Sequence, residues 1–125
     1  MQCLTPKSMA ELSGALAQAT PATRILAGGT DYVLHERKGD FTPDLLIYPG
    51  AIPELHQISL TDDGLTIGAM VTMREIADAL SSVPAYRAIA DMAANVGSPQ
   101  IRNKATLAGN LANASPAGDS LPVCL

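Results

Sequence analysis

The chain has 125 residues, 47% of them apolar and 16% charged, so it can bury the core of one small domain. A net charge of −4 without clustered Lys or Arg argues against nucleic acid as a partner, and 3% aromatic residues argue against a base-stacking surface. No apolar run is long enough to span a membrane, and no secretion signal opens the sequence. We therefore expect a cytoplasmic protein.

The first half of the chain alternates predicted strands and helices. Ser8 and Glu11 match a capping box and predict a helix that begins after Ser8. A second helix is expected after Thr30, where a Gly-rich turn ends. Three apolar runs are typical of short strands, at 2–5, 24–27 and 44–48. This order predicts a small βαβ unit with parallel strands over residues 1–55.

The second half predicts a hairpin followed by helices. Alternating apolar residues on either side of an Asp-Gly turn predict a β-hairpin over 57–69. Thr72 and Glu75 match a second capping box, and another helix is expected over 81–97, with a glycine as its C-cap. Residues 56–125 are then the beginning of a second α/β subdomain. The fold class that we predict is α+β.

Cysteines and histidines give no sign of a metal site. Cys3 and Cys124 match no metal or iron–sulfur spacing, and they are typical of reduced structural thiols. His35 and His56 are isolated and read as surface or hydrogen-bonded side chains. We see no acid–base pair or nucleophile triad, and we predict no catalytic residue.

Two segments carry the residues suited to hold a ligand. The turn at 28–31 reads Gly-Gly-Thr-Asp between a strand and a helix, a layout that presents backbone amides to a phosphate. A tight strand-to-helix turn without a ligand explains it equally well. The stretch 96–122 combines small residues with hydroxyl, amide and carboxylate groups, and a polar surface loop is its simplest interpretation.

These segments resemble a known family. The stretch 101–110 reads I-R-N-K-A-T-L-A-G-N and 114–122 reads A-S-P-A-G-D-S-L-P, similar to the flavin signature of the molybdenum hydroxylase flavoproteins. That family includes the FAD domain of xanthine dehydrogenase and the medium subunits of carbon monoxide dehydrogenases. Residues 27–31, A-G-G-T-D, resemble its first flavin motif. One departure is Ala108, which stands where the family commonly has Gly.

The resemblance implies a cofactor and a set of contacts. The cofactor is FAD, held in a fold of the PCMH or vanillyl-alcohol-oxidase type, with the pyrophosphate between the two glycine segments. Asp119 would accept a hydrogen bond from the ribose or adenine. The residues implied in FAD binding are Ile25, Leu26, Ala27, Gly28, Gly29, Thr30, Asp31, Tyr32, Thr106, Leu107, Ala108, Gly109, Asn110 and Asp119.

The resemblance also implies a role in electron transfer. The chain would be an oxidoreductase component, and FAD would relay electrons from iron–sulfur clusters to NAD or another acceptor. Molybdopterin and the 2Fe-2S clusters are expected on partner chains, a large molybdopterin-binding subunit and a small iron–sulfur subunit. Two alternatives remain open: a remnant that docks to those subunits without flavin, and a different flavoenzyme of the vanillyl-alcohol oxidase type.

Three physical expectations follow from the resemblance. Gly29 and Gly109 should face one groove with free backbone amides. The family's flavin domain continues beyond the Asp-x-x-Pro motif, so we expect a truncated domain that is inactive by itself. Because most of the cover for the flavin ring would lie in that continuation, we expect the chain alone to bind FAD poorly or not at all and to self-associate.

Overall fold

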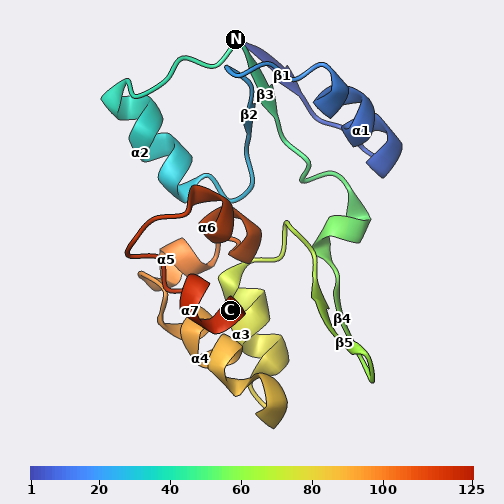
Figure 1. Ribbon diagram of the computed structural model, residues 1–125, viewed down its shortest axis with the longest axis vertical. Helices are drawn as coiled ribbons and strands as arrows, with labels where there is room; N and C mark the ends of the chain where they lie inside the picture. Colours follow the sequence, from blue (N-terminus) through green and yellow to red (C-terminus); the bar gives the residue numbers. More distant parts are fainter.

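The computed structural model describes residues 1–125 and arranges them in two halves, one above the other in Figure 1. The upper half contains a parallel three-stranded sheet in the order β1-β3-β2, which confirms the expected βαβ unit. Its elements are β1 (Gln2–Leu4), α1 (Met9–Ala17), β2 (Arg24–Ile25), α2 (Thr30–Lys38) and β3 (Leu45–Ile47).

The central strand β3 carries the buried residues of this sheet. Ile47 is fully buried and Leu46 is nearly so, and Figure 1 shows α1 and α2 on either side of the strands. The edge strand β2 differs from expectation, because it has two residues instead of four and Ile25 is 57% exposed. An edge strand has a neighbour on one side only, so its residues need not be buried.

The cap of α1 differs from the predicted capping box by one residue. The Ser8 hydroxyl accepts a hydrogen bond from the Glu11 amide, as expected. The Glu11 carboxylate, however, accepts from the amide of Lys7 at 2.8 Å instead of the amide of Ser8. The Glu11 carboxylate accepts a hydrogen bond from a free amide at the helix start whether that amide is the one of Lys7 or of Ser8. The pattern therefore still located the start of α1 correctly.

The lower half contains the hairpin and a cluster of helices. Strands β4 (Ile58–Thr61) and β5 (Gly64–Ile67) pair antiparallel, as the Asp-Gly turn predicted. A 3₁₀ turn, η1 (Pro53–His56), leads from β3 into this hairpin. The helical elements are α3 (Met73–Leu80), η2 (Pro84–Tyr86), α4 (Arg87–Asn95), α5 (Pro99–Arg102), α6 (Leu107–Asn113) and α7 (Leu121–Cys124).

One apolar cluster holds the lower half together. Helices α3 and α4 supply most of it, and apolar residues of the hairpin pack against its edge. Met73 and Met92 belong to this cluster, so they fill the core, as methionines often do. Its ten buried members are Val71, Met73, Ile76, Leu80, Ala90, Met92, Ala93, Val96, Ala105 and Leu107.

Two expectations about the second half need correction. The helix expected over 81–97 is a 3₁₀ turn followed by α4, which starts only at Arg87 because Pro84 suits the first position of a short turn. Gly97 does end this segment in a left-handed conformation. The stretch 96–122 is not an irregular surface loop, since it forms three short helices and includes the buried residues Ala105 and Leu107.

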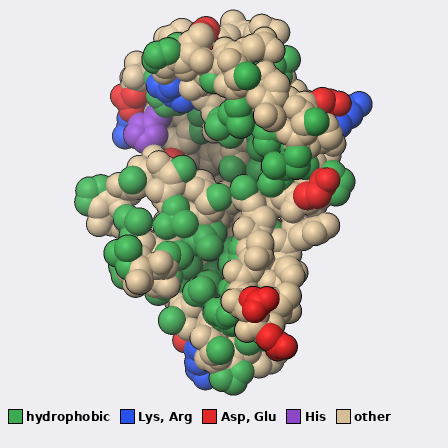
Figure 2. All heavy atoms as spheres, turned by 45° about the vertical axis from the view of Figure 1, so that its right-hand side comes forward, with side chains coloured by type: hydrophobic (Ala, Val, Ile, Leu, Met, Phe, Trp, Pro, Cys, Tyr) green, Lys and Arg blue, Asp and Glu red, His purple; other side chains and the backbone are tan.

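Figure 2 shows that hydrophobic side chains gather over the lower half and around the hollow between the halves. None of the helices combines the length and the apolar character needed to cross a bilayer. The division of the chain into domains at residues 1–55 and 56–125 stays a prediction.

The capping box of α3 generates a pH-dependent prediction. The Glu75 carboxylate accepts from the Thr72 amide at 2.8 Å and the Thr72 hydroxyl at 2.7 Å. These bonds, the amide first, lower the pKa of Glu75 from its ordinary value of 4.5. A lowered folded-state pKa stabilises the fold above the ordinary pKa, and this contribution is lost as pH falls through the lower value.

We therefore expect Glu75→Gln to reduce the free energy of unfolding at neutral pH by about 0.5–1.5 kcal/mol, with the difference shrinking to zero below the lowered pKa. Urea denaturation across this pH range measures it. Glu54→Gln is the matched control, because Glu54 is exposed in the first turn of η1, where no side chain makes a capping hydrogen bond. A Glu75→Gln difference that persists unchanged in acid would contradict the linkage.

Candidate functional site

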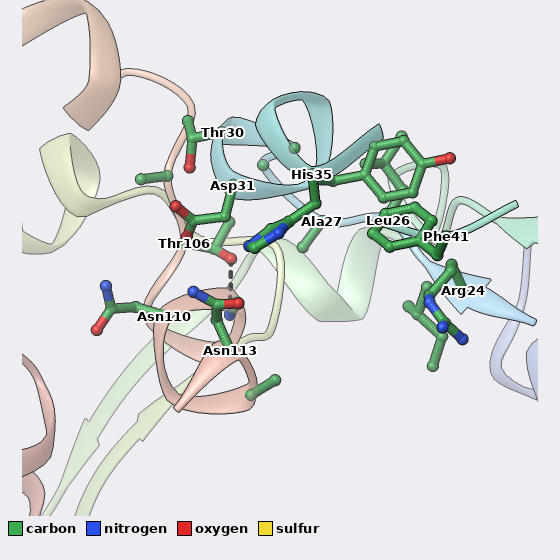
Figure 3. Close-up of a pocket in the computed structure, with 17 residues that line it drawn as sticks. Arg24, Leu26, Ala27, Thr30, Asp31, His35, Phe41, Thr106, Asn110 and Asn113 are labelled. Carbon is green, nitrogen blue, oxygen red and sulfur yellow. Dashed lines mark hydrogen bonds between the residues drawn. The ribbon is translucent and has the colours of Figure 1, made fainter. Parts of the chain in front are cut away.

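A cavity of about 380 Å³ lies between the two halves of the molecule. One wall is the turn from β2 into α2, and the other is the start and inner face of α6 (Figure 3). Its volume is at the lower end of the range of small-molecule sites. The lining residues are Arg24, Ile25, Leu26, Ala27, Gly28, Gly29, Thr30, Asp31, Tyr32, His35, Phe41, Ala105, Thr106, Gly109, Asn110, Ala112 and Asn113.

The two glycines of the first wall have different physical tasks. Gly29 is the N-cap of α2 and has φ 75°, a left-handed conformation that disfavours any residue with a Cβ. Gly28 lies against the other half of the molecule. A Cβ added to Gly28 would overlap the carbonyl group of Lys104 and lie 3.0 Å from the Cα of Ala105. Glycine at this position therefore lets the two walls touch.

Six consecutive backbone amides of the first wall are free to bind a ligand. The N–H groups from Ala27 to Tyr32 donate no hydrogen bond within the protein, whereas the next one, Val33, bonds the carbonyl of Gly29. All six residues line the cavity. Amides at a helix N-terminus attract anions through their N–H groups and through the helix dipole. The donor set therefore fits a phosphate or pyrophosphate group.

The second wall is fixed to the lower core. Ala105 accepts a hydrogen bond from the Met73 amide at 2.8 Å, and Thr106 pairs with Thr72 in an isolated bridge. The Thr106 hydroxyl caps α6 by accepting from the amide of Gly109 at 3.0 Å, the dashed line in Figure 3. Gly29 and Gly109 thus face one cavity as expected, but the expectation of a free amide at Gly109 is wrong.

Few charged groups line this cavity. Arg24 lies over the ring of Phe41 at 5.0 Å, and its Nη1 donates to the backbone carbonyls of Pro21 and Thr23. Asp31 is the one carboxylate in the lining. The pKa of Tyr32 is raised above its ordinary value of 10.0 by partial burial and by the carboxylate of Glu36. Tyr32 therefore stays neutral at physiological pH.

Comparison with known proteins places the chain in a family. Residues 1–125 match the family described as the FAD binding domain in molybdopterin dehydrogenase. The chain belongs to this family. It is 38% identical over 119 residues to the nicotinate dehydrogenase FAD-subunit of Eubacterium barkeri, which covers 93% of this chain and 40% of that protein. The xanthine dehydrogenase FAD-binding subunit of Escherichia coli O157:H7 is 33% identical, with 80% of this chain and 35% of that protein covered.

Solved structures show the same fold. The reconstituted CO dehydrogenase from Oligotropha carboxidovorans superimposes with a TM-score of 0.87 at 29% identity, covering 96% of this chain and 42% of that chain. This confirms the expected α+β fold and the resemblance from which it was predicted. The chain spans about 40% of the length of the FAD subunit from Eubacterium barkeri.

Eleven of the fourteen residues implied by the family motifs line the cavity. These are the eight residues from Ile25 to Tyr32 together with Thr106, Gly109 and Asn110. Leu107 is instead buried in the lower core, and Ala108 and Asp119 lie outside the lining. Ala108 adopts a helical conformation in α6, so Ala in place of the family's Gly introduces no backbone strain there.

In the flavin signature at 101–110 and 114–122, Ser120 and not Asp119 contacts a residue of the cavity lining, Asn110. The hydroxyl of Ser120, which is fully buried, donates a hydrogen bond to the side-chain oxygen of Asn110. Arg102 of the same motif is structural, because its guanidinium donates to the carbonyls of Val96 and Gly97 at the end of α4. Asp119 itself is exposed, and its contact with FAD stays a prediction.

Six lining residues were missed by the sequence patterns. His35 follows Asp31 by one helical turn and so lies on the same face of α2, a spacing that could have indicated it. Asn113 follows Asn110 by three residues on α6 in the same way. Phe41 carries no such signal, because a loop brings it back over α2. The missed residues are Arg24, His35, Phe41, Ala105, Ala112 and Asn113.

The contact at Gly28 generates a prediction. Gly28→Ala should lower the free energy of unfolding by about 1–3 kcal/mol, because the added Cβ meets backbone atoms that cannot rotate away. Gly14→Ala is the matched control. Gly14 lies inside α1 with open space around it, so the same change should raise stability by about 0.5–1 kcal/mol. Chemical denaturation of both variants checks the pair, and equal effects would refute the close contact.

Proposed function

We propose that the cavity holds the pyrophosphate of FAD and the groups next to it. The observation that carries this proposal is the run of six unbonded amides from Ala27 to Tyr32 at the start of α2. Such amides bind the doubly charged pyrophosphate without a lysine, and no lysine lines the cavity. The chain's membership in a family of FAD-binding domains supports the choice of this ligand among phosphate compounds.

Each wall has a defined part in this proposal. The turn from Ile25 to Tyr32 wraps the pyrophosphate and the adjoining sugar chain. Gly28 lets this turn lie against the second wall, and Gly29 allows the left-handed conformation at the start of α2. Residues 106–110 close the opposite side, mainly through the side chain of Asn110, because the Gly109 amide is already bonded. Leu107 and Ala108 support this wall from behind, and Asp119 would meet the ribose or adenine.

The proposed activity is electron relay in a molybdopterin-dependent dehydrogenase. FAD supplies the redox chemistry when bound, since its ring accepts and returns electrons. The residues of this chain bind the cofactor, fix its orientation and exclude water from the pyrophosphate. Electrons would arrive from iron–sulfur clusters on a small subunit and leave to NAD or another acceptor, while a large subunit holds the molybdopterin. The names of the relatives, FAD subunits of nicotinate and xanthine dehydrogenases, support this assignment.

A second candidate is a fold that docks to those subunits without flavin. The free amides of Ala27 and Gly28 disfavour it, because they add two unpaired donors to the four that every helix start leaves without an intrahelical partner. Colour separates the two candidates directly: a flavin-loaded complex is yellow when purified, and a docking remnant is colourless.

A charge placed beside the amides tests the proposed site. The side chain of Ala27 faces α6, since its Cβ lies 3.8 Å from the position that a Cβ on Gly109 would occupy. Ala27→Asp should weaken FAD binding on the order of tenfold or more relative to Ala27→Asn, because a carboxylate repels the pyrophosphate. The asparagine variant is the matched control, with the same shape and no charge. Equilibrium dialysis against FAD gives both dissociation constants, and equal values would place the pyrophosphate elsewhere.

The relay itself has a separate test on the assembled complex. Removal of FAD should leave substrate-dependent reduction of the iron–sulfur clusters intact and abolish reduction of the final acceptor. Absorbance of the clusters and of the acceptor measures the two steps independently. Full reduction of the acceptor by the FAD-free complex would overturn the proposed relay, but it would not contradict the proposal that the cavity binds FAD.

A further inference from the structure

An imidazole held by a carboxylate projects into the cavity from α2. His35 lies one helical turn after Asp31, and Figure 3 shows its ring pointing toward Asn113 and Thr106 on the opposite wall. Its Nδ1 is 2.7 Å from a carboxylate oxygen of Asp40, in the loop that follows α2. Neither residue belongs to the motifs that define the FAD-binding segments.

This bond determines what the other ring nitrogen can do. A carboxylate accepts only, so Nδ1 of His35 must carry the proton. In neutral His35 the Nε2 atom is then an acceptor, because it carries a lone pair. In protonated His35 the Nε2 atom is a donor and the ring carries a positive charge. Protonation therefore changes this group from one that repels a phosphate oxygen to one that binds it.

We propose that His35, oriented by Asp40, is a binding residue for the pyrophosphate of FAD and makes FAD affinity depend on pH near neutrality. This inference rests on the proposed function, because it requires the pyrophosphate to lie in this cavity. Histidine is the side chain whose charge ordinarily changes between about pH 5 and 8. The affinity should be higher on the acidic side of that range and fall as the ring loses its proton.

The other charged groups around His35 do not change their charge in that range. The carboxylates of Asp31 and Glu36 belong to α2, and Glu36 accepts a hydrogen bond from the Tyr32 hydroxyl. Asp40 lies in the loop that follows α2. From β2 comes the guanidinium of Arg24, and α6 offers only the neutral amides of Asn110 and Asn113. Carboxylates stay ionised, and guanidinium stays protonated, between about pH 6 and 8. A slope in this window that His35→Gln removes is then specific to His35.

FAD is also a suitable probe, because the charge of FAD itself is constant between about pH 6 and 8. Each phosphate of a pyrophosphate diester has one strongly acidic proton, lost well below neutral pH. ADP is unsuitable, since a terminal phosphate monoester titrates near pH 6. Riboflavin, which lacks phosphate, serves as the ligand control.

The experiment is a set of FAD dissociation constants at about pH 6 and about pH 8, measured by equilibrium dialysis on the chain assembled with its partner subunits. The wild-type protein should bind FAD about three- to tenfold more weakly at the higher pH, as expected for a partly exposed charge pair. His35→Gln should bind with the weaker affinity at both pH values. His35→Lys should restore the tighter binding at the higher pH, which a purely structural role of His35 would not produce.

His56→Gln is the matched control, because Nε2 of His56 bonds the carbonyl of Gly50 outside the cavity. It should keep the wild-type pH dependence, and riboflavin should show none. FAD binding that is equally tight at both pH values, or a slope that survives in His35→Gln, would overturn the inference and leave the proposed function standing. Absence of FAD binding at both pH values by the folded chain within its assembled complex would overturn both.

Discussion

The contact between Gly28 and the backbone of Lys104 and Ala105 positions the rest of the site. Ala105 is fixed in the lower half by its own burial and by the hydrogen bond from Met73. Because no Cβ stands between them, the turn after β2 lies directly against this fixed segment. Amides of the upper half and side chains of α6 then face each other across a cavity, although residues 28 and 105 are far apart in the sequence. Without this approach, each half keeps its own core but the two walls separate.

The free amides explain why the site needs so few charged side chains. An unpaired N–H that is closed off from water costs about 1–3 kcal/mol, so six in a row are tolerable only where water or a ligand reaches them. In this cavity they provide a fixed field that favours negative charge, and the dipole of α2 adds to it. A lysine there would bring a mobile charge with a large conformational entropy to lose. The donor geometry depends instead on φ and ψ at Gly28 and Gly29, which the chain fixes during folding.

The sequence was sufficient for the order of elements and for the first wall of the site. The caps at Ser8 and Thr72 and the Asp-Gly turn involve only residues close to them in the sequence. Their patterns therefore located α1, α3 and the hairpin. Properties that depend on contacts between residues far apart in the sequence were harder to predict from the sequence. The exposure of Ile25 follows from the edge position of β2, and the burial of Leu107 follows from packing on α3 and α4. The bonded amide of Gly109 depends on a Thr106 rotamer, which a motif does not specify.

His35 illustrates why a side chain oriented by a partner outside its own helix is difficult to predict. The sequence does not link His35 to the carboxylate that orients it, since Asp40 lies beyond the end of α2. The left-handed Gly39 turns the chain back, and this turn alone brings the Asp40 carboxylate to Nδ1. Backbone amides give this cavity a constant preference for anions, whereas a side chain such as His35 can alter that preference with pH. In the proposed site, the amides would provide the capacity to bind a pyrophosphate, and His35 would set the pH at which it binds most tightly.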